Sequence, residues 1–168
     1  FYHRRGYDKQ YEWLGAIFLD YEVEGGDQTR EEISRNFIVY GHNVDDDREN
    51  GEMFAKLINY DDPEYAAEYP YIWYYTEEDA MLFYVFAAFL SEDSDWYIYP
   101  NQSDEEFEAV IAEALERSEI LTDDIEVTKD DKIITLATCT DQNDMNWTQR
   151  WVVMGRLARE GDDHGMEI

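Results

Sequence analysis

The single cysteine of this 168-residue chain is the first candidate for chemistry. Cys139 ends the apolar run KIITLATCT at residues 132–140, and polar residues follow it at once. A thiol attacks a carbonyl only when a nearby group takes up its proton, and a lone cysteine is more often an inert core residue. We interpret Cys139 as a residue at the end of a strand, on the boundary between core and solvent, where a nucleophile can project.

Two other side chains occupy similar places and offer complementary chemistry. His42 ends an apolar run, whereas His3 and His164 lie near the chain ends. Arg150 opens the run at 149–158. A histidine can hold the thiol proton and return it to a leaving amine, and an arginine can stabilise an oxyanion. Each has an ordinary alternative as a surface or core residue, but the three together favour an acyl-transfer site.

Short strands must position these residues. The apolar patterns predict strands at 11–20, 35–43, 71–76, 80–90, 96–100, 132–138 and 149–158, with a hairpin turn at 77–79. Residues 52–60 and 103–118 carry helical spacing instead. Ser103 and Glu106 form a capping box for the second helix, whose buried stripe is predicted to be Phe107, Val110, Ile111, Ala114 and Leu115. Many short strands with two helices predict a mainly β fold, a closed or nearly closed barrel.

Composition narrows the class of protein. Residues 1–168 suit a single domain, and 44% hydrophobic residues are too many for a disordered chain. A net charge of −28 disfavours nucleic acid and anionic lipid as partners. One cysteine excludes an internal disulfide and a thiolate-rich zinc site. The acidic loop at 43–52 lacks the calcium-loop pattern because Arg48 occupies a ligand position, so we expect no metal and no cofactor.

Several motifs, read in order, resemble those of one family. TLATC at 135–139 resembles the TLxTC motif of sortases, the transpeptidases of the Gram-positive cell surface, and YGHN at 40–43 resembles their histidine motif. MFAKLINY at 53–60 is similar to the segment that follows the histidine in class B members, and RWVVMGRL at 150–157 resembles the final strand led by arginine. The resemblance runs from about residue 15 to residue 158.

The resemblance implies a sortase-type eight-stranded β-barrel with inserted helices, including a long helix between the sixth and seventh strands. It implies that Cys139 is the nucleophile, His42 the acid/base and Arg150 the oxyanion and substrate clamp. Substrate-binding residues are then expected around the same mouth: Asn43, Tyr97, Ile98, Ala137, Thr138 and Thr140.

The implied function is cleavage of an NPxTx-like sorting signal near the C-terminus of secreted proteins. A thioester acyl-enzyme would then pass the protein to an amine of a peptidoglycan precursor or a pilin. We expect a monomer on the extracellular face of the membrane, anchored by an N-terminal segment absent from this chain. Two alternatives stay open: a non-catalytic acidic β-barrel that binds a cell-surface partner, and a related enzyme that mainly hydrolyses its signal peptide.

Overall fold

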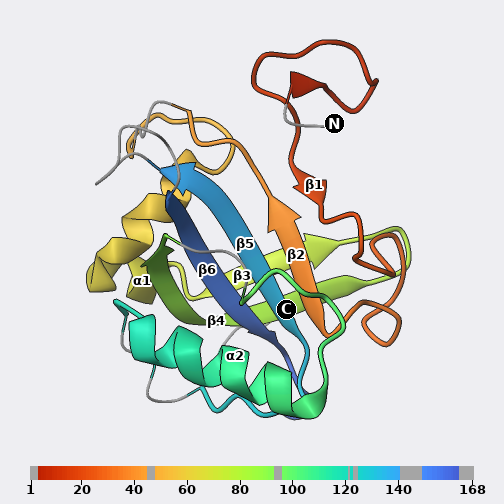
Figure 1. Cartoon of the computed structure of the whole chain (residues 1–168), viewed down its shortest axis with the longest axis vertical. Helices are drawn as coiled ribbons and strands as arrows, with labels where there is room; N and C mark the ends of the chain where they lie inside the picture. Colours follow the sequence, from red (N-terminus) through yellow and green to blue (C-terminus); the bar gives the residue numbers. More distant parts are fainter. Residues whose placement is uncertain are drawn as a thin grey trace.

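Strands dominate the computed structural model, which describes residues 4–44, 48–92, 96–120, 122, 125–140 and 149–162. Six strands in these residues form one sheet: β1 (Phe18–Leu19), β2 (Asn36–Tyr40), β3 (Tyr71–Tyr75), β4 (Ala80–Ser91), β5 (Ile133–Thr140) and β6 (Gln149–Leu157). Their order across the sheet is β1-β2-β5-β6-β4-β3. The sheet curls, so that β3 and β4 run across behind β2, β5 and β6 (Figure 1).

One parallel pair sets the geometry of one edge of the sheet. β2 pairs with β5 in parallel, from Asn36 opposite Ile133 to Tyr40 opposite Ala137, whereas the other neighbouring strands are antiparallel. Parallel strands end at the same edge of a sheet, so the residues after β2 and at the end of β5 lie together. We call this edge, where β6 also begins, the mouth; it is at the top of Figure 1.

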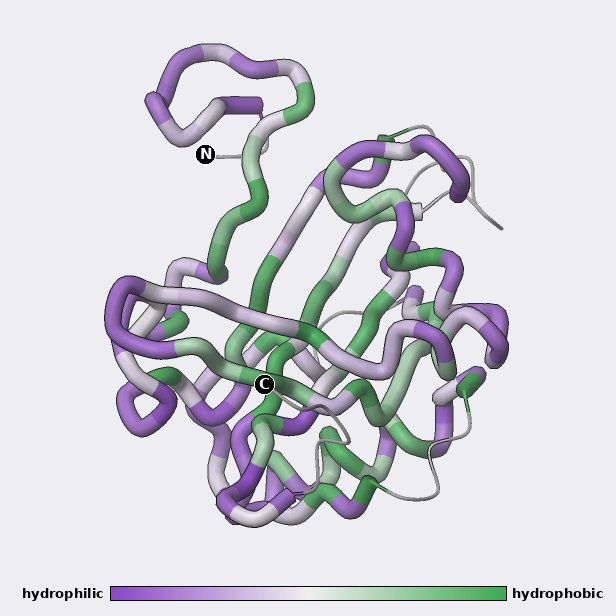
Figure 2. Tube along the Cα trace, turned by 180° about the vertical axis from the view of Figure 1, so that it is seen from behind, coloured by the Kyte–Doolittle hydropathy of each residue, from purple (hydrophilic) through white to green (hydrophobic). Residues whose placement is uncertain are grey.

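Both faces of the sheet are buried, which explains why β5 reads as a nearly continuous apolar run. One core lies inside the curl and contains Ile134 and Leu136 of β5. The other lies between the opposite face and helix α2 (Asp104–Arg117), and it contains Ile133 and Ala137. Hydrophobic residues accordingly follow the strands, and hydrophilic residues follow the loops (Figure 2). Alternate residues of β5 therefore point into different cores.

The helices agree with the sequence analysis in part. The capping box of Ser103 and Glu106 is confirmed at the start of α2. The prediction that Leu115 is buried is wrong, because its side chain is 47% exposed and the buried stripe ends at Ala114. The helix predicted at 52–60 is a 3₁₀ helix, η2 (Ala55–Asp61), and it begins later because Met53 has a positive φ of 57°.

Helix α1 (Pro63–Glu68) was not predicted, although the sequence carries its signals. Asp62 is the N-cap and accepts a hydrogen bond from the backbone of Glu64, while Pro63 occupies the first turn. An aspartate followed by proline is typical of a helix start. None of the helices in the part of the chain that the structure describes is long and apolar enough to cross a bilayer.

One predicted strand is much too long and another is wrong. In 11–20 the strand contains only Phe18 and Leu19, because a turn precedes them and Gly15 has a φ of 69°; Tyr11 forms just an isolated bridge with Arg5. Residues 96–100 belong to no strand, since three of their carbonyls bind one residue of β2, Asn36, rather than a ladder partner. A mainly β fold with a curled sheet is therefore observed, with six strands in the described residues and α2 between β4 and β5.

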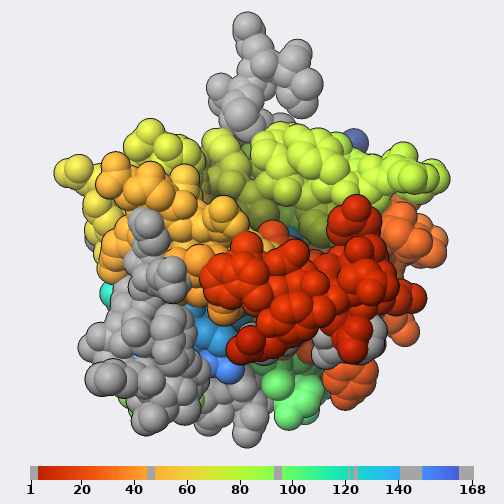
Figure 3. Space-filling model, turned by 90° about the horizontal axis from the view of Figure 1, so that it is seen from above, coloured from red at the N-terminus to blue at the C-terminus, as the bar shows by residue number. Residues whose placement is uncertain are grey.

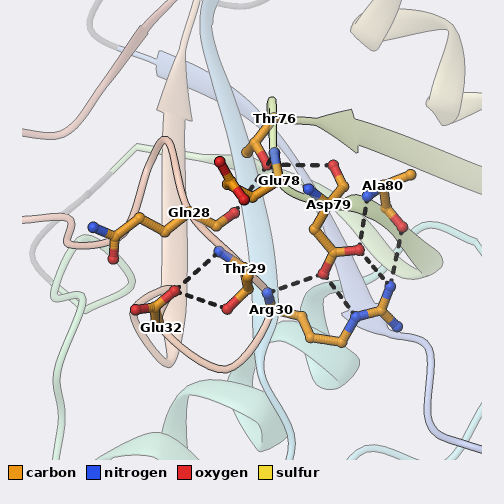
Figure 4. Close-up of polar contacts among 8 residues, drawn as sticks. All are labelled: Gln28, Thr29, Arg30, Glu32, Thr76, Glu78, Asp79 and Ala80. Carbon is orange, nitrogen blue, oxygen red and sulfur yellow. Dashed lines mark hydrogen bonds and ion pairs between the residues drawn. The ribbon is translucent and has the colours of Figure 1, made fainter.

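Side chains join the two edges of the curled sheet. The segment between β1 and β2 meets the β3–β4 hairpin through Arg30, whose guanidinium makes two 2.8 Å bonds to the carboxylate of Asp79 (Figure 4). Tyr74 Oη donates to the carbonyl of Gly26 at 2.7 Å, and Thr76 Oγ1 donates to that of Gln28 at 3.0 Å. This seam joins the segment between β1 and β2 to β3 and the β3–β4 turn through side-chain bonds.

Candidate functional site

The β5–β6 pair places a thiol opposite a guanidinium. Cys139 and Arg150 are direct partners in the antiparallel register, a relation that puts Cα atoms roughly 4.5–5.5 Å apart. Cys139 shares a face of β5 with Ala137, and Arg150 shares a face of β6 with Val152. Since Ala137 and Val152 belong to the core under α2, both functional side chains lie on that face of the sheet.

A pocket of ≈ 300 Å³ opens at this place. It is lined by residues from five separate parts of the chain: Phe18, Tyr40, Gly41, Tyr97, Ile98, Ala137, Thr138, Cys139 and Arg150. The cysteine is a free thiol, neither fully buried nor fully exposed. The pocket therefore has room for a segment of another chain, apolar or polar, to lie against the sulfur of Cys139.

The parallel pairing brings His42 to the level of Cys139. Beyond the last pair of β2 and β5, the backbone N–H of Gly41 donates to the carbonyl of Ala137 at 3.3 Å, and Asn43 Nδ2 donates to the carbonyl of Cys139 at 2.9 Å. His42 lies between these two bonds. It is half-buried, and it is not among the pocket-lining residues of the described chain.

Two aromatic residues, Trp13 and Phe54, contact His42. Its ring meets that of Trp13 edge to face, with centroids 6.5 Å apart, and its carbonyl accepts a 2.9 Å bond from the backbone N–H of Phe54. A Cβ on Gly41 would lie 2.5 Å from the ring of Phe54. Glycine is thus required before the histidine because the chain passes directly against this ring.

The positive charge of Arg150 acts on the pKa of a neighbouring tyrosine in the pocket. Burial raises the pKa of Tyr40 well above its usual range, and the nearby Asp20 raises it further, while Arg150 acts in the opposite direction. Tyr40 is therefore a neutral hydroxyl at any physiological pH. Arg150 itself donates from Nη1 to the carbonyl of Gln149 at 3.0 Å. It supplies a positive charge to a pocket in an otherwise acidic protein.

The residues predicted to bind substrate fall into two groups. Tyr97, Ile98, Ala137 and Thr138 line the pocket, and Thr138 Oγ1 also donates to the carbonyl of Gly41 at 2.9 Å. Asn43 and Thr140 are buried and do not line it.

Three lining residues escaped the sequence analysis as site residues: Phe18, Tyr40 and Gly41. Tyr40 and Gly41 belong to the YGHN motif, so the motif itself was the available signal. Phe18 comes from β1, and nothing in its sequence context indicates that β1 reaches the mouth.

Some predicted features lie outside the described residues, namely His3, His164 and the connection at 141–148. The acidic loop at 43–52 is described except for 45–47, and in it Arg48 forms an ion pair with Asp61 at 2.5 Å. Among the described residues, no cluster of three or more histidine, cysteine or acidic side chains could hold a metal ion.

Seen from above, the mouth is partly covered. The N-terminal segment lies over it on one side and the segment after β2 on another, and part of β5 and β6 stays visible between them (Figure 3). The arrangement offers a thiol, a cation directly across from it and an imidazole at the same level of the sheet. These groups can perform attack on a carbonyl, stabilisation of the oxyanion and proton transfer.

Comparisons with known proteins agree on one family. The family described as Sortase domain matches residues 5–158. The sortase B of Listeria monocytogenes serovar 1/2a is 30% identical over 161 residues, which cover 94% of this chain and 60% of that protein. The chain spans about 60% of the length of the curated relatives that it matches.

Solved structures of sortase B are also similar to this chain. A Staphylococcus aureus sortase B–substrate complex has a TM-score of 0.77 and 25% identity, over 94% of this chain and 68% of that one. The structure of sortase B from Listeria monocytogenes has a TM-score of 0.74 and 28% identity, over 92% of this chain and 79% of that one.

Proposed function

Because the chain belongs to the sortase family, as the match over residues 5–158 shows, we propose that it is a class B cysteine transpeptidase. The observation that carries the proposal is the direct pairing of Cys139 with Arg150 in one pocket. The sortase B names of its relatives support the class.

In the proposed reaction, the thiolate of Cys139 attacks the carbonyl carbon of the threonine in the sorting signal. The electron pair of the carbonyl moves to its oxygen, and Arg150 stabilises this oxyanion from across the β5–β6 pair. Collapse of the tetrahedral intermediate breaks the C–N bond and leaves a thioester. The departing peptide carries away its amine.

His42 is proposed to move the protons. It takes up the proton of the thiol and gives it to the leaving amine, then accepts a proton from the incoming amine as that nitrogen attacks the thioester. This second attack releases the thiolate and forms the new amide bond. The position of His42, level with Cys139 at the mouth, supports the role.

We propose an NPxTx-like signal as the substrate, held by Tyr97, Ile98, Ala137 and Thr138 on the pocket wall. Asn43 and Thr140 would support this wall from behind. The substrate complex formed by the S. aureus sortase B, which shares this fold, supports a substrate site of the same kind here. The acceptor would be an amine of a peptidoglycan precursor or of a pilin.

The remaining expectations belong to the same proposal. Residues 1–168 would be one catalytic domain, monomeric, with the eight-stranded barrel of the family and α2 between its sixth and seventh strands. The protein would act on the extracellular face of the membrane, anchored by an N-terminal segment.

The test is a panel of NPxTx and LPxTx peptides, each incubated with the protein and amine acceptors such as triglycine. Mass spectrometry should find cleavage after threonine and a product joined to the amine. Hydroxylamine should trap the thioester as a hydroxamate. If only the hydrolysed product formed at every amine concentration, the reaction would be hydrolysis rather than transpeptidation.

A thiol-specific probe separates the enzyme from a non-catalytic barrel. Cys139 is the only cysteine, so labelling of the native protein reports on this sulfur alone. Rapid labelling is expected. A native protein that neither labels nor cleaves any peptide of the panel would overturn the proposal.

A further inference from the structure

Asn36, the first residue of β2, is a polar residue with 0% exposure. Its backbone N–H donates to the carbonyl of Pro100 at 2.9 Å, and its Nδ2 donates to the carbonyls of Tyr97 at 2.7 Å and Tyr99 at 3.4 Å. Its Oδ1 accepts a 2.7 Å bond from Thr135 Oγ1, which fixes the orientation of the amide. One buried residue therefore holds three carbonyls of a single segment.

That segment is residues 96–102, called the wall segment below. It belongs to no strand, so its carbonyls depend largely on side-chain donors for hydrogen bonds. The neighbouring Arg35 adds one bond, from Nη1 to the carbonyl of Gln102 at 3.1 Å, and an ion pair to Asp104 at 2.7 Å. The start of β2 thus anchors the wall segment along most of its length.

The wall segment forms one side of the pocket. Tyr97 and Ile98 line it together with Cys139. Asn36 itself is far from the sulfur, since it pairs with Ile133, and Cys139 lies six positions further along β5, roughly 20 Å along the strand. Any effect of Asn36 on the pocket must therefore pass through the wall segment.

We propose that Asn36 is a positioning residue, which fixes Tyr97 and Ile98 in the pocket wall and so determines which signal peptides bind beside Cys139. The inference rests on the function proposed above and adds a determinant of substrate selectivity to it. Loss of the amide would remove the donor to the buried carbonyl of Tyr97 and to the partly buried carbonyl of Tyr99, and the wall segment would have to move to bring them to water. The Cys139–Arg150 pair would stay in place, because the β5–β6 ladder holds it.

Two substitutions test the inference. Asn36→Leu keeps the size of the side chain and removes both donors. Thr135→Val keeps the shape and removes only the bond that orients the amide. Lys132→Met is the matched control, because Lys132 also binds three carbonyls, those of Arg30, Glu31 and Ile33, at the end of β5 away from the pocket.

The first measurement does not need enzymatic activity. Cys139 is alkylated with a small reagent, iodoacetamide, and with a bulky one, fluorescein maleimide, and the ratio of the two rates reports the width of the pocket. We expect this ratio to change by about fivefold in Asn36→Leu and less in Thr135→Val, and to stay unchanged in Lys132→Met.

The second measurement is the kinetics of the best peptide in the panel. KM should rise about tenfold in Asn36→Leu, the equivalent of one net hydrogen bond, with kcat within about twofold. Preference among peptides should change at the positions that face Tyr97 and Ile98. A purely structural role would reduce the amount of folded protein without this separation of KM from kcat.

The results can overturn the inference. An unchanged labelling ratio with unchanged KM in folded Asn36→Leu would do so, and so would an equal change in Lys132→Met. If Asn36→Leu does not fold, Thr135→Val decides by the same criteria. If the unaltered chain cleaves no peptide, the proposed function fails while the labelling ratio still decides whether Asn36 positions the wall segment.

Discussion

The two ends of β5 differ in what their side chains bind. At the end away from the mouth, charged side chains bind neighbouring loops: Lys132 Nζ donates to three carbonyls of the segment before β2 at 2.6–2.9 Å. Beside it, Asp131 accepts two 2.7 Å bonds from Arg159 and further bonds from Thr128. At the mouth, Asn43 and Thr138 bind backbone carbonyls and leave the side chain of Cys139 uncovered by either.

Along β5, the contacts expected to govern stability and the groups expected to react therefore lie at different ends. The far end fixes the loops with charged groups, of which Asp131 is buried, whereas the mouth keeps a half-buried thiol next to a pocket. Substitutions at the mouth should therefore change activity and leave stability alone, and substitutions at the far end should do the reverse. The following experiments test this division, from the largest expected effect to the smallest.

Cys139→Ala should abolish peptide cleavage, with a loss of about a thousandfold or more, because no other thiol can form the acyl-enzyme. The free energy of unfolding should stay within about 0.5 kcal/mol, since the thiol is only half-buried and alanine removes a single heavy atom. Peptide cleavage assays and urea titration measure the two quantities. A large loss of stability would show that the sulfur belongs to the core.

Arg150→Ala should lower kcat about a hundredfold, the usual loss for an oxyanion donor. Arg150→Lys should restore the rate only in part, because lysine lacks the planar fork of donors. Arg30, which pairs with Asp79 at the β3–β4 hairpin and does not line the pocket, is the matched control, and Arg30→Ala should leave kcat unchanged. A normal rate in Arg150→Ala would remove this residue from the reaction.

Asp131→Asn should cost about 2–3 kcal/mol of stability, because it weakens two charged hydrogen bonds at a buried site. Its effect on cleavage should be small. Glu126→Gln is the control, since Glu126 is 80% exposed and meets the same Arg159 only at 3.8 Å. That variant should change stability by less than about 0.5 kcal/mol.

The same site predicts a dependence on pH. Burial alone would raise the pKa of Asp131, but hydrogen bonds from Arg159 and Thr128 outweigh it and hold the pKa below its usual range. A lowered pKa in the folded state contributes stability that is present above the unfolded value of about 4 and is lost as the pH falls below it. Urea titrations between pH about 2 and 6 should give a shallower acid dependence in Asp131→Asn, and an unaltered profile would contradict the assignment.

The smallest effect is expected on α2. Leu115→Gln should change stability by no more than about 0.5 kcal/mol because the side chain is exposed. Ile111→Ala, one turn earlier and buried against the sheet, should cost about 2–4 kcal/mol. Equal losses in the two variants would mean that the helix buries a wider face than the structure describes.

The sequence indicated the parts of the fold that local patterns control. The β3–β4 hairpin, β5, β6 and the capping box of α2 are confirmed, because alternation, apolar runs and cap residues act within one element. The strand predicted at 96–100 failed for the opposite reason. Tyrosine and isoleucine favour strands, but the backbone there is bonded to Asn36, some sixty positions earlier in the chain.

The candidate site shows the same limit. Cys139, His42 and Arg150 stood out by residue type and by their place after apolar runs. That Cys139 and Arg150 are opposite partners follows from the antiparallel pairing of two strands that are consecutive in the chain. The parallel pairing that aligns His42 with Cys139, and the arrival of Phe18 at the pocket, depend on long-range topology, which no local pattern encodes.

The parallel pairing of β2 with β5 also has a consequence for the order of folding. Cys139 and Arg150 are joined by a short connection, but Gly41 and Thr138 are 97 positions apart in the chain. Closing the longer loop costs more entropy, and contacts between distant positions slow folding. Thiol labelling at successive times during refolding would follow this order. We expect the thiol to meet its arginine early and its histidine last, so a partly folded chain carries a nucleophile that has not yet been activated.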